Sequence, residues 1–173
     1  MRLSELFREV EFDGSIKNDA DINLVTDDSR LVRPGSLFVC IRHRSFDGHT
    51  AAVDALASGA AAVVTQNRLG LENELRVADS RSAYARLCAA LCNHPERKLR
   101  LIGVTGTNGK TTVTTLIRNI LSDSGTKTLL TGTVCNRLGD ENLPSGLTTP
   151  KPPELYSLLS RAVSQRCKAC VME

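Results

Sequence analysis

The apolar residues of the first hundred positions fall into two patterns, which predict two kinds of secondary structure. Continuous apolar runs that are too short for a helix predict buried strands at residues 22–25, 36–41 and 60–65. Apolar residues at helical spacing predict helices at residues 3–10, 51–58 and 80–93. Because these strands and helices alternate, we expect a parallel α/β unit.

The rest of the chain repeats this alternation and predicts a second unit. Its expected elements are a strand, a helix, a strand, a helix and a strand, at residues 100–105, 111–122, 127–131, 153–165 and 170–172. The charged stretch 94–98 contains a proline, so we place a boundary there between a domain at 1–97 and another at 98–173. Two or three parallel strands with helices on at most one face leave apolar surface uncovered, so we expect the second domain to be truncated.

The strand at 100–105 runs into a glycine-rich turn with the features of a phosphate-binding loop. Gly106 and Gly109 allow successive backbone N–H groups to point at an anion, and the following helix adds its N-terminal dipole. Lys110 would reach the outer phosphates of a nucleotide as the catalytic residue, and the hydroxyl of Thr111 would bind Mg²⁺. We expect the ammonium of Lys110 to have no partner in the empty loop. The predicted ATP-binding residues are Gly106, Thr107, Asn108, Gly109, Lys110, Thr111 and Thr112.

The strict form of this motif has a glycine where the chain has Val104. An ordinary strand-to-helix turn is therefore the structural alternative. The apolar strand before the turn and the amphipathic helix after it favour phosphate binding.

Other polar positions have both a structural and a functional interpretation. Ser29 follows a strand, and its hydroxyl either caps a turn or binds a ligand. The basic loop 42–49 either binds a diphosphate or is a solvated charged loop. Thr148 and Thr149 precede a proline, which holds them extended. Glu173 ends an apolar strand and is either a Mg²⁺ ligand facing the phosphate loop or a surface glutamate.

Composition narrows the class of protein. Apolar residues make up 41% and charged residues 24% of the chain, as in soluble globular proteins, and the 3% of aromatic residues predict an aliphatic core. The net charge is +3, and the basic residues are scattered, so nucleic-acid binding is not supported. The six cysteines include one C-x-x-C pair without a second pair at a zinc-finger distance, which favours structural free thiols. The amphipathic N-terminus is neither a secretion signal nor a membrane span, so we expect a cytoplasmic protein.

The amino-acid sequence of the phosphate loop, Gly-Thr-Asn-Gly-Lys-Thr-Thr at 106–112, resembles that of the Mur ligases. Further motifs are similar to those of one branch, the UDP-N-acetylmuramoyl-tripeptide synthetases. They are Asp28-Ser-Arg30, Pro34-Gly-Ser-Leu-Phe-Val39, Phe46-Asp-Gly-His49, Leu147-Thr-Thr-Pro150 and Val171-Met-Glu173. The resemblance covers nearly the whole chain. It departs from the family at His43, where the family usually has a glycine.

The resemblance implies a small N-terminal α/β domain that binds a UDP substrate, followed by the start of a parallel-sheet ATP-binding domain with the phosphate loop. It implies an ATP- and Mg²⁺-dependent ligase of peptidoglycan synthesis that forms an amide bond through an acyl phosphate. The substrates would be UDP-N-acetylmuramoyl-L-alanyl-D-glutamate and either diaminopimelate or lysine. The implied substrate-binding residues are Ser29, Arg44, Ser45, Phe46, Thr148 and Thr149, and the implied Mg²⁺ ligands are Thr111 and Glu173.

We therefore interpret the chain as an N-terminal fragment of a monomeric ligase, inactive by itself. Two alternatives stay open at this point. Another Mur-type or folylpolyglutamate-type ligase would share the phosphate loop. A non-catalytic nucleotide-binding module would account for the short length of the chain.

Overall fold

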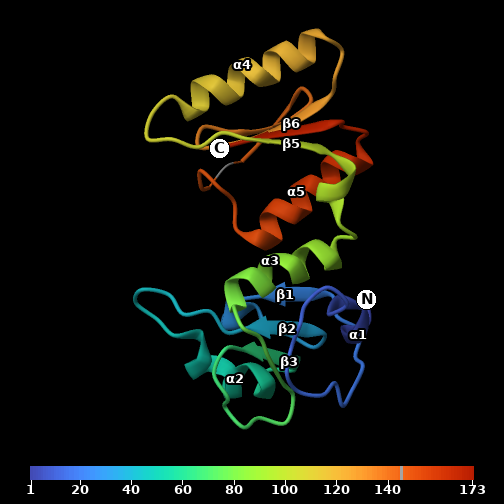
Figure 1. Ribbon diagram of the computed structural model, residues 1–173, viewed down its shortest axis with the longest axis vertical. Helices are drawn as coiled ribbons and strands as arrows, with labels where there is room; N and C mark the ends of the chain where they lie inside the picture. The colour runs from blue at the N-terminus through green and yellow to red at the C-terminus, as the bar shows by residue number, and fades with distance from the viewer. Residues whose placement is uncertain (145) are drawn as a thin grey trace. The chain divides into compact units, whose positions relative to one another are not determined.

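The strands of the chain form two separate sheets, which belong to different units. The computed structural model describes residues 1–144 and 146–173. One unit comprises Met1–Leu91 and the other Cys92–Glu173 (Figure 1).

The first unit is built on a four-stranded parallel sheet with the strand order β1-β2-β3-β4. The strands are β1 (Leu24–Thr26), β2 (Ser36–Val39), β3 (Ala60–Thr65) and β4 (Glu74–Arg76). The helices are α1 (Leu3–Leu6), α2 (Ala52–Ala57) and α3 (Ser80–Leu91), with 3₁₀ helices at Ser29–Leu31 and Gly48–Ala51. The predicted strands and helices are confirmed, although α1 is shorter than expected and β4 was not predicted.

The core of this unit is mostly aliphatic, and Phe38 of β2 lies fully buried in it. All four residues of β2 are buried, as its continuous apolar run predicted. Phe38 packs with Val63 of β3 and with Ala52 and Ala55 of α2. The small alanine side chains allow this helix to lie close to the sheet.

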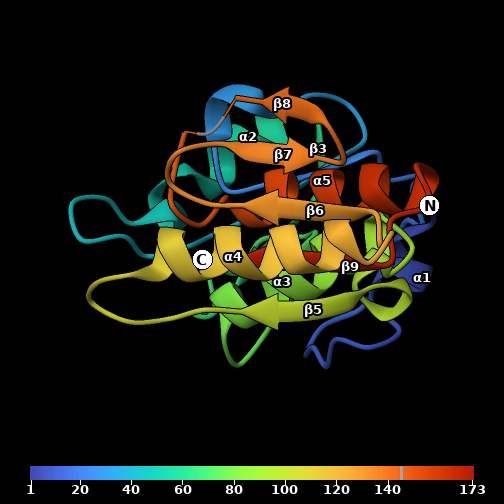
Figure 2. The same ribbon diagram turned by 90° about the horizontal axis from the view of Figure 1, so that it is seen from above.

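The second unit has a five-stranded mixed sheet with the order β5-β9-β6-β7-β8, which Figure 2 shows strand by strand. The strands are β5 (Arg100–Gly103), β6 (Thr128–Thr131), β7 (Asn136–Leu138), β8 (Glu141–Leu143) and β9 (Ala169–Met172). Strands β5, β9 and β6 are parallel, and β7 and β8 add an antiparallel hairpin. The fold class, α/β with a parallel sheet, is confirmed.

Helices cover both faces of the second sheet, so the expectation of helices on at most one face was wrong. α4 (Lys110–Asp123) lies on one face and α5 (Pro152–Ser164) on the other (Figure 1). Side chains alternate between the faces of a strand, and Leu129 and Cys170 pack in one buried cluster with Leu159 of α5. The unpredicted hairpin contributes Leu138 to the same cluster.

Apolar surface nevertheless stays exposed in this unit, as predicted. Leu116 and Ile120 on α4 are 56% and 68% exposed, and Leu101 on the outer strand β5 is 43% exposed. The buried residues of α4 are instead Thr114 and Arg118. Within the described part of the chain, no helix is both long and apolar enough to cross a membrane.

All six cysteines are free, and burial sets the chemistry of two of them. Burial raises the pKa of the Cys40 thiol and of the Cys170 thiol to about 12. Because the thiolate is the reactive form, we expect iodoacetamide at pH 8 to leave both unmodified in the folded protein and to label the partly exposed Cys135. Mass spectrometry of the peptides measures this. Labelling of Cys170 at the rate of Cys135 would contradict the buried position.

Candidate functional site

The phosphate loop of the second unit joins the end of β5 to the start of α4. Gly106 and Gly109 have positive φ angles of +149° and +80°, a backbone conformation that other residues rarely adopt. Gly109 is the N-cap residue directly before α4, so the free N–H groups of the first turn open into the loop. This backbone explains why the glycines occur at these two positions.

Lys110 lies folded over the loop. Its ammonium group donates to the main-chain oxygen of Gly106 at 2.8 Å and contacts that of Thr107 at 3.4 Å. The expectation that this side chain has no partner was therefore wrong. Because these acceptors are carbonyls of the loop itself, the positive charge is already held beside the proposed phosphate site.

A cleft of about 370 Å³ collects residues from four parts of the second unit. Glu173 reaches it from the end of β9, Thr133 from the segment after β6, and Thr148 from the segment before α5. The remaining lining residues come from the loop and from α4: Thr107, Asn108, Gly109, Lys110, Thr111 and Thr112. The carboxyl ends of the parallel strands β5, β9 and β6 share one edge of the sheet, which explains the meeting of distant residues.

The carboxylate of Glu173 is held by neighbours that the sequence did not identify. The hydroxyl of Thr133 donates to its Oε2 at 2.9 Å. Gly132 lies against the same side chain, so closely that a Cβ atom there would be 2.3 Å from Oε1. Gly132-Thr133 directly follows a predicted strand, and this position at the carboxyl end of the strand is the signal that could have revealed them.

Thr149 also contacts Glu173, although it does not line the cleft. Its hydroxyl donates to the main-chain oxygen of Glu173 at 3.0 Å. The structure therefore brings both predicted threonines, Thr148 and Thr149, to the end of β9. Hydroxyl and carboxylate oxygens are the ligands that Mg²⁺ prefers, so Thr111 and Glu173 fit this cation.

In the first unit, Ser29 begins a 3₁₀ helix that another residue caps. The side chain of Asp28 accepts from the N–H of Arg30 at 3.0 Å and thereby performs the capping. Within the described residues, the hydroxyl of Ser29 has no hydrogen-bond partner. It is therefore available to a ligand.

The basic loop after β2 is a tight turn that exposes three predicted site residues. The N–H of His43 donates to the carbonyl of Phe46 at 2.8 Å. The residues Arg44, Ser45 and Phe46 are exposed, and the Phe46 ring is half-exposed. The structure thus presents a cation, a hydroxyl and an aromatic face on one short turn.

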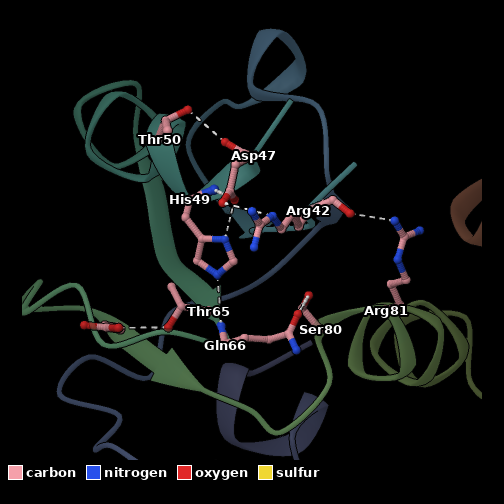
Figure 3. Close-up of polar contacts among 9 residues, drawn as sticks. Arg42, Asp47, His49, Thr50, Thr65, Gln66, Ser80 and Arg81 are labelled. Carbon is pink, nitrogen blue, oxygen red and sulfur yellow. Dashed lines mark hydrogen bonds and ion pairs between the residues drawn. The ribbon is translucent and has the colours of Figure 1, made fainter. Parts of the chain in front are cut away.

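His49 anchors the end of this loop to the sheet, as Figure 3 shows. Its buried imidazole contacts Asp47 Oδ1 through Nδ1 at 2.6 Å, and its Nε2 accepts from the N–H of Gln66 at 3.1 Å. Because Nε2 accepts, Nδ1 carries the hydrogen and donates it to Asp47. This hydrogen bond lowers the pKa of Asp47, and Arg81 holds the start of the loop through the main-chain oxygen of Arg42 at 2.6 Å. The Phe-Asp-Gly-His motif is thus a loop anchor.

His43, which replaces the glycine that the family usually has, contacts the turn that carries Ser29. Its Nε2 lies 3.4 Å from Oδ2 of Asp27, whose side chain is only 8% exposed. The hydroxyl of Tyr84 donates to the other oxygen of the same carboxylate at 3.2 Å. The departure from the family pattern therefore links the basic loop to the Ser29 turn.

Comparison with known families gives two matches along the chain. Residues 21–93 match the model described as "Mur ligase family, catalytic domain", and residues 104–173 match "Mur ligase middle domain". The matches lie in different units of the structure.

Curated relatives and solved structures agree with these matches. The UDP-N-acetylmuramoyl-L-alanyl-D-glutamate--2,6-diaminopimelate ligase of Phocaeicola vulgatus is 37% identical over the whole of this chain, which covers 37% of that protein. The ligase of the same name from Geobacillus kaustophilus is 42% identical over 88% of this chain and 32% of its own length. A solved structure of a ligase with this name superposes with a TM-score of 0.74 and 27% identity, over 99% of this chain and 35% of the other. The chain thus spans about a third of the length of these relatives.

Proposed function

The chain belongs to the Mur ligase family, and on this premise we propose that the whole protein joins diaminopimelate to UDP-N-acetylmuramoyl-L-alanyl-D-glutamate with ATP. The product would be a peptidoglycan precursor with three amino-acid residues. The names of the relatives support diaminopimelate over lysine, the choice that the sequence alone left open. A monomeric state and a cytoplasmic location are part of the same proposal.

The observation that carries this proposal is the cleft beside the phosphate loop. Lys110, Thr111 and Glu173 line it together with Thr148. A cation, a hydroxyl and a carboxylate around a glycine-rich helix start form a site for a nucleotide polyphosphate and Mg²⁺. Bound Mg²⁺ would neutralise part of the negative charge on the phosphate oxygens.

The proposed reaction has two steps. A carboxylate oxygen of the UDP substrate attacks the γ-phosphorus of ATP, the bond to the leaving oxygen of ADP breaks, and an acyl phosphate forms. The amine of diaminopimelate then attacks the acyl carbon, releases phosphate and loses a proton. Lys110 stabilises the charge that moves to the leaving oxygens. Thr148 holds the substrate beside the γ-phosphate from within the cleft, next to Thr149, which is bound to the end of β9.

We assign one of the two sequence domains to the UDP substrate and the other to ATP. Residues 1–97 would bind the UDP part through Ser29, Arg44, Ser45 and Phe46, and residues 98–173 would form the first part of the ATP-binding domain. Arg44 suits the diphosphate because a guanidinium can bind two phosphate oxygens at once. The available hydroxyl of Ser29 and the anchored basic loop support this assignment.

Titration calorimetry of the chain with UDP-N-acetylmuramoyl-L-alanyl-D-glutamate tests the assignment. We expect Ser29→Ala to weaken binding about fivefold, the equivalent of one hydrogen bond of about 1 kcal/mol. Ser82→Ala is the matched control, because Ser82 is an exposed serine of α3 outside the proposed site. Equal affinities of the wild type and Ser29→Ala would remove Ser29 from the site, and a wild-type chain without affinity would contradict the domain assignment.

A further inference from the structure

Three side chains form a continuous row across the cleft of the second unit. The hydroxyl oxygens of Thr148 and Thr133 are 3.0 Å apart, and the Thr133 hydroxyl is 2.9 Å from Oε2 of Glu173. These residues come from three separate segments of the chain. Thr133 is the middle member of the row.

The direction of the hydrogen bonds follows from the chemistry of the groups. An ionised carboxylate only accepts, so the hydrogen of Thr133 must point toward Glu173. A hydroxyl has a single hydrogen, and Thr133 is also placed as the donor toward the hydroxyl oxygen of Thr148. This hydrogen can serve only one of the two acceptors at a time, and the charged carboxylate is the stronger one. The carboxylate thus competes with Thr148 for the hydrogen of Thr133.

Contacts of its main chain and of Gly132 hold Glu173 at the end of β9. Gly132 lies against the carboxylate on one side, where even a Cβ atom would be too close. The main chain of Glu173 donates to the carbonyl of Thr131 and accepts from the hydroxyl of Thr149. A hydroxyl hydrogen turns without moving any heavy atom, so the hydroxyl groups can respond to a cation at the carboxylate while this backbone stays in place.

We propose that Thr133 is a positioning residue that couples the nucleotide side of the cleft, at Glu173, to the substrate side, at Thr148. The inference rests on the proposed function, because it takes Glu173 as a cation ligand and Thr148 as a substrate ligand. A cation beside Glu173 weakens the carboxylate as an acceptor. The hydrogen of Thr133 can then turn to the oxygen of Thr148, so that the hydrogen of Thr148 points away from Thr133 and toward the anionic UDP substrate.

Two substitutions separate the hydroxyl of Thr133 from its shape. Thr133→Val keeps the branched shape and removes the hydroxyl, whereas Thr133→Ser keeps the hydroxyl and removes the methyl group. Thr133 is exposed, so neither change opens a cavity in the core. Thermal unfolding of both variants checks that the fold is intact.

The test is calorimetric binding of UDP-N-acetylmuramoyl-L-alanyl-D-glutamate to the whole protein, with and without Mg²⁺ and a non-hydrolysable ATP analogue. In the wild type we expect the analogue to strengthen substrate binding about tenfold, a typical coupling between two sites. Thr133→Val should reduce this ratio to below twofold, and Thr133→Ser should preserve it.

Several results would overturn the proposal. They are a wild-type ratio near one, an unchanged ratio in Thr133→Val, and an equal loss in Thr133→Ser, which would assign the effect to packing. A wild-type protein that binds neither the analogue nor the UDP substrate would refute the proposed function itself, and the role of Thr133 with it.

Discussion

Replacing Lys110 by alanine is expected to lower the turnover of the whole ligase by about a hundredfold or more. A fixed ammonium stabilises charge on the transferring phosphoryl group better than mobile water does, and removal of one preorganised donor of this kind costs about 3 kcal/mol or more. The structure places this ammonium over the loop, 2.8 Å from the oxygen of Gly106. The measurement is steady-state phosphate release with both substrates present.

The matched control for this variant is Lys168→Ala. Lys168 is an exposed lysine of the same unit outside the cleft, so its removal changes the net charge equally and should leave turnover unchanged. We expect thermal unfolding of Lys110→Ala to be nearly that of the wild type, because water can replace the ammonium at the loop carbonyls. Near-normal turnover of Lys110→Ala would refute the assignment of the phosphate loop.

Gly132→Ala is expected to reduce turnover by about a hundredfold through the displacement of Glu173. The new Cβ atom would lie 2.3 Å from Oε1 and 2.8 Å from Cδ of this side chain. Because the clash involves the end of a flexible side chain, the carboxylate should swing out of the cleft while the fold survives. The loss is estimated from the removal of one charge-stabilising group at an active site.

Gly103→Ala provides the comparison for Gly132→Ala. Gly103 ends β5 in the same sheet, and a Cβ atom there would meet no atom within 4 Å. Phosphate release and thermal unfolding are measured for both variants. If Gly132→Ala keeps more than half of the wild-type turnover, the reaction does not depend on the position of the Glu173 carboxylate in the cleft.

The parts of the fold that the sequence predicted are those with a strong hydrophobic pattern. The run at 60–65 became β3 with the predicted bounds, and the helix expected at 111–122 became α4. Strands β4, β7 and β8 were missed because each has three residues with a single leucine among polar neighbours, whereas the equally short β1 lies in the apolar run 22–25.

The candidate site was predicted only as far as its residues lie in contiguous motifs. The phosphate loop is one such motif, and its glycines have the backbone that the spacing implied. The contact between Thr133 and Glu173 depends on the strand order β5-β9-β6, which joins residues far apart in the chain and has no local signal. The capping of the 3₁₀ helix at Ser29–Leu31 depended on which side chain, Asp28 or Ser29, turned toward the backbone, and spacing does not distinguish these.

The Phe-Asp-Gly-His motif is a further case in which the sequence marks a segment but not the contacts of its residues. The sequence marked Phe46 to His49 as a recognisable segment but did not show what each residue does. In the structure, Gly48 has no room for a side chain beside Ile41, and His49 joins Asp47 to the end of β3. These roles depend on neighbours that the fold brings together.

The most direct test of the proposed ligase is mass spectrometry of the reaction of the whole protein. The mixture contains UDP-N-acetylmuramoyl-L-alanyl-D-glutamate, ATP, Mg²⁺ and either diaminopimelate or lysine. We expect a product heavier by one diaminopimelate residue, formed together with an equal amount of ADP, and little or no product with lysine. No amide product with either amino acid, or ADP formed without product, would contradict the assignment of this chain to a ligase of that reaction.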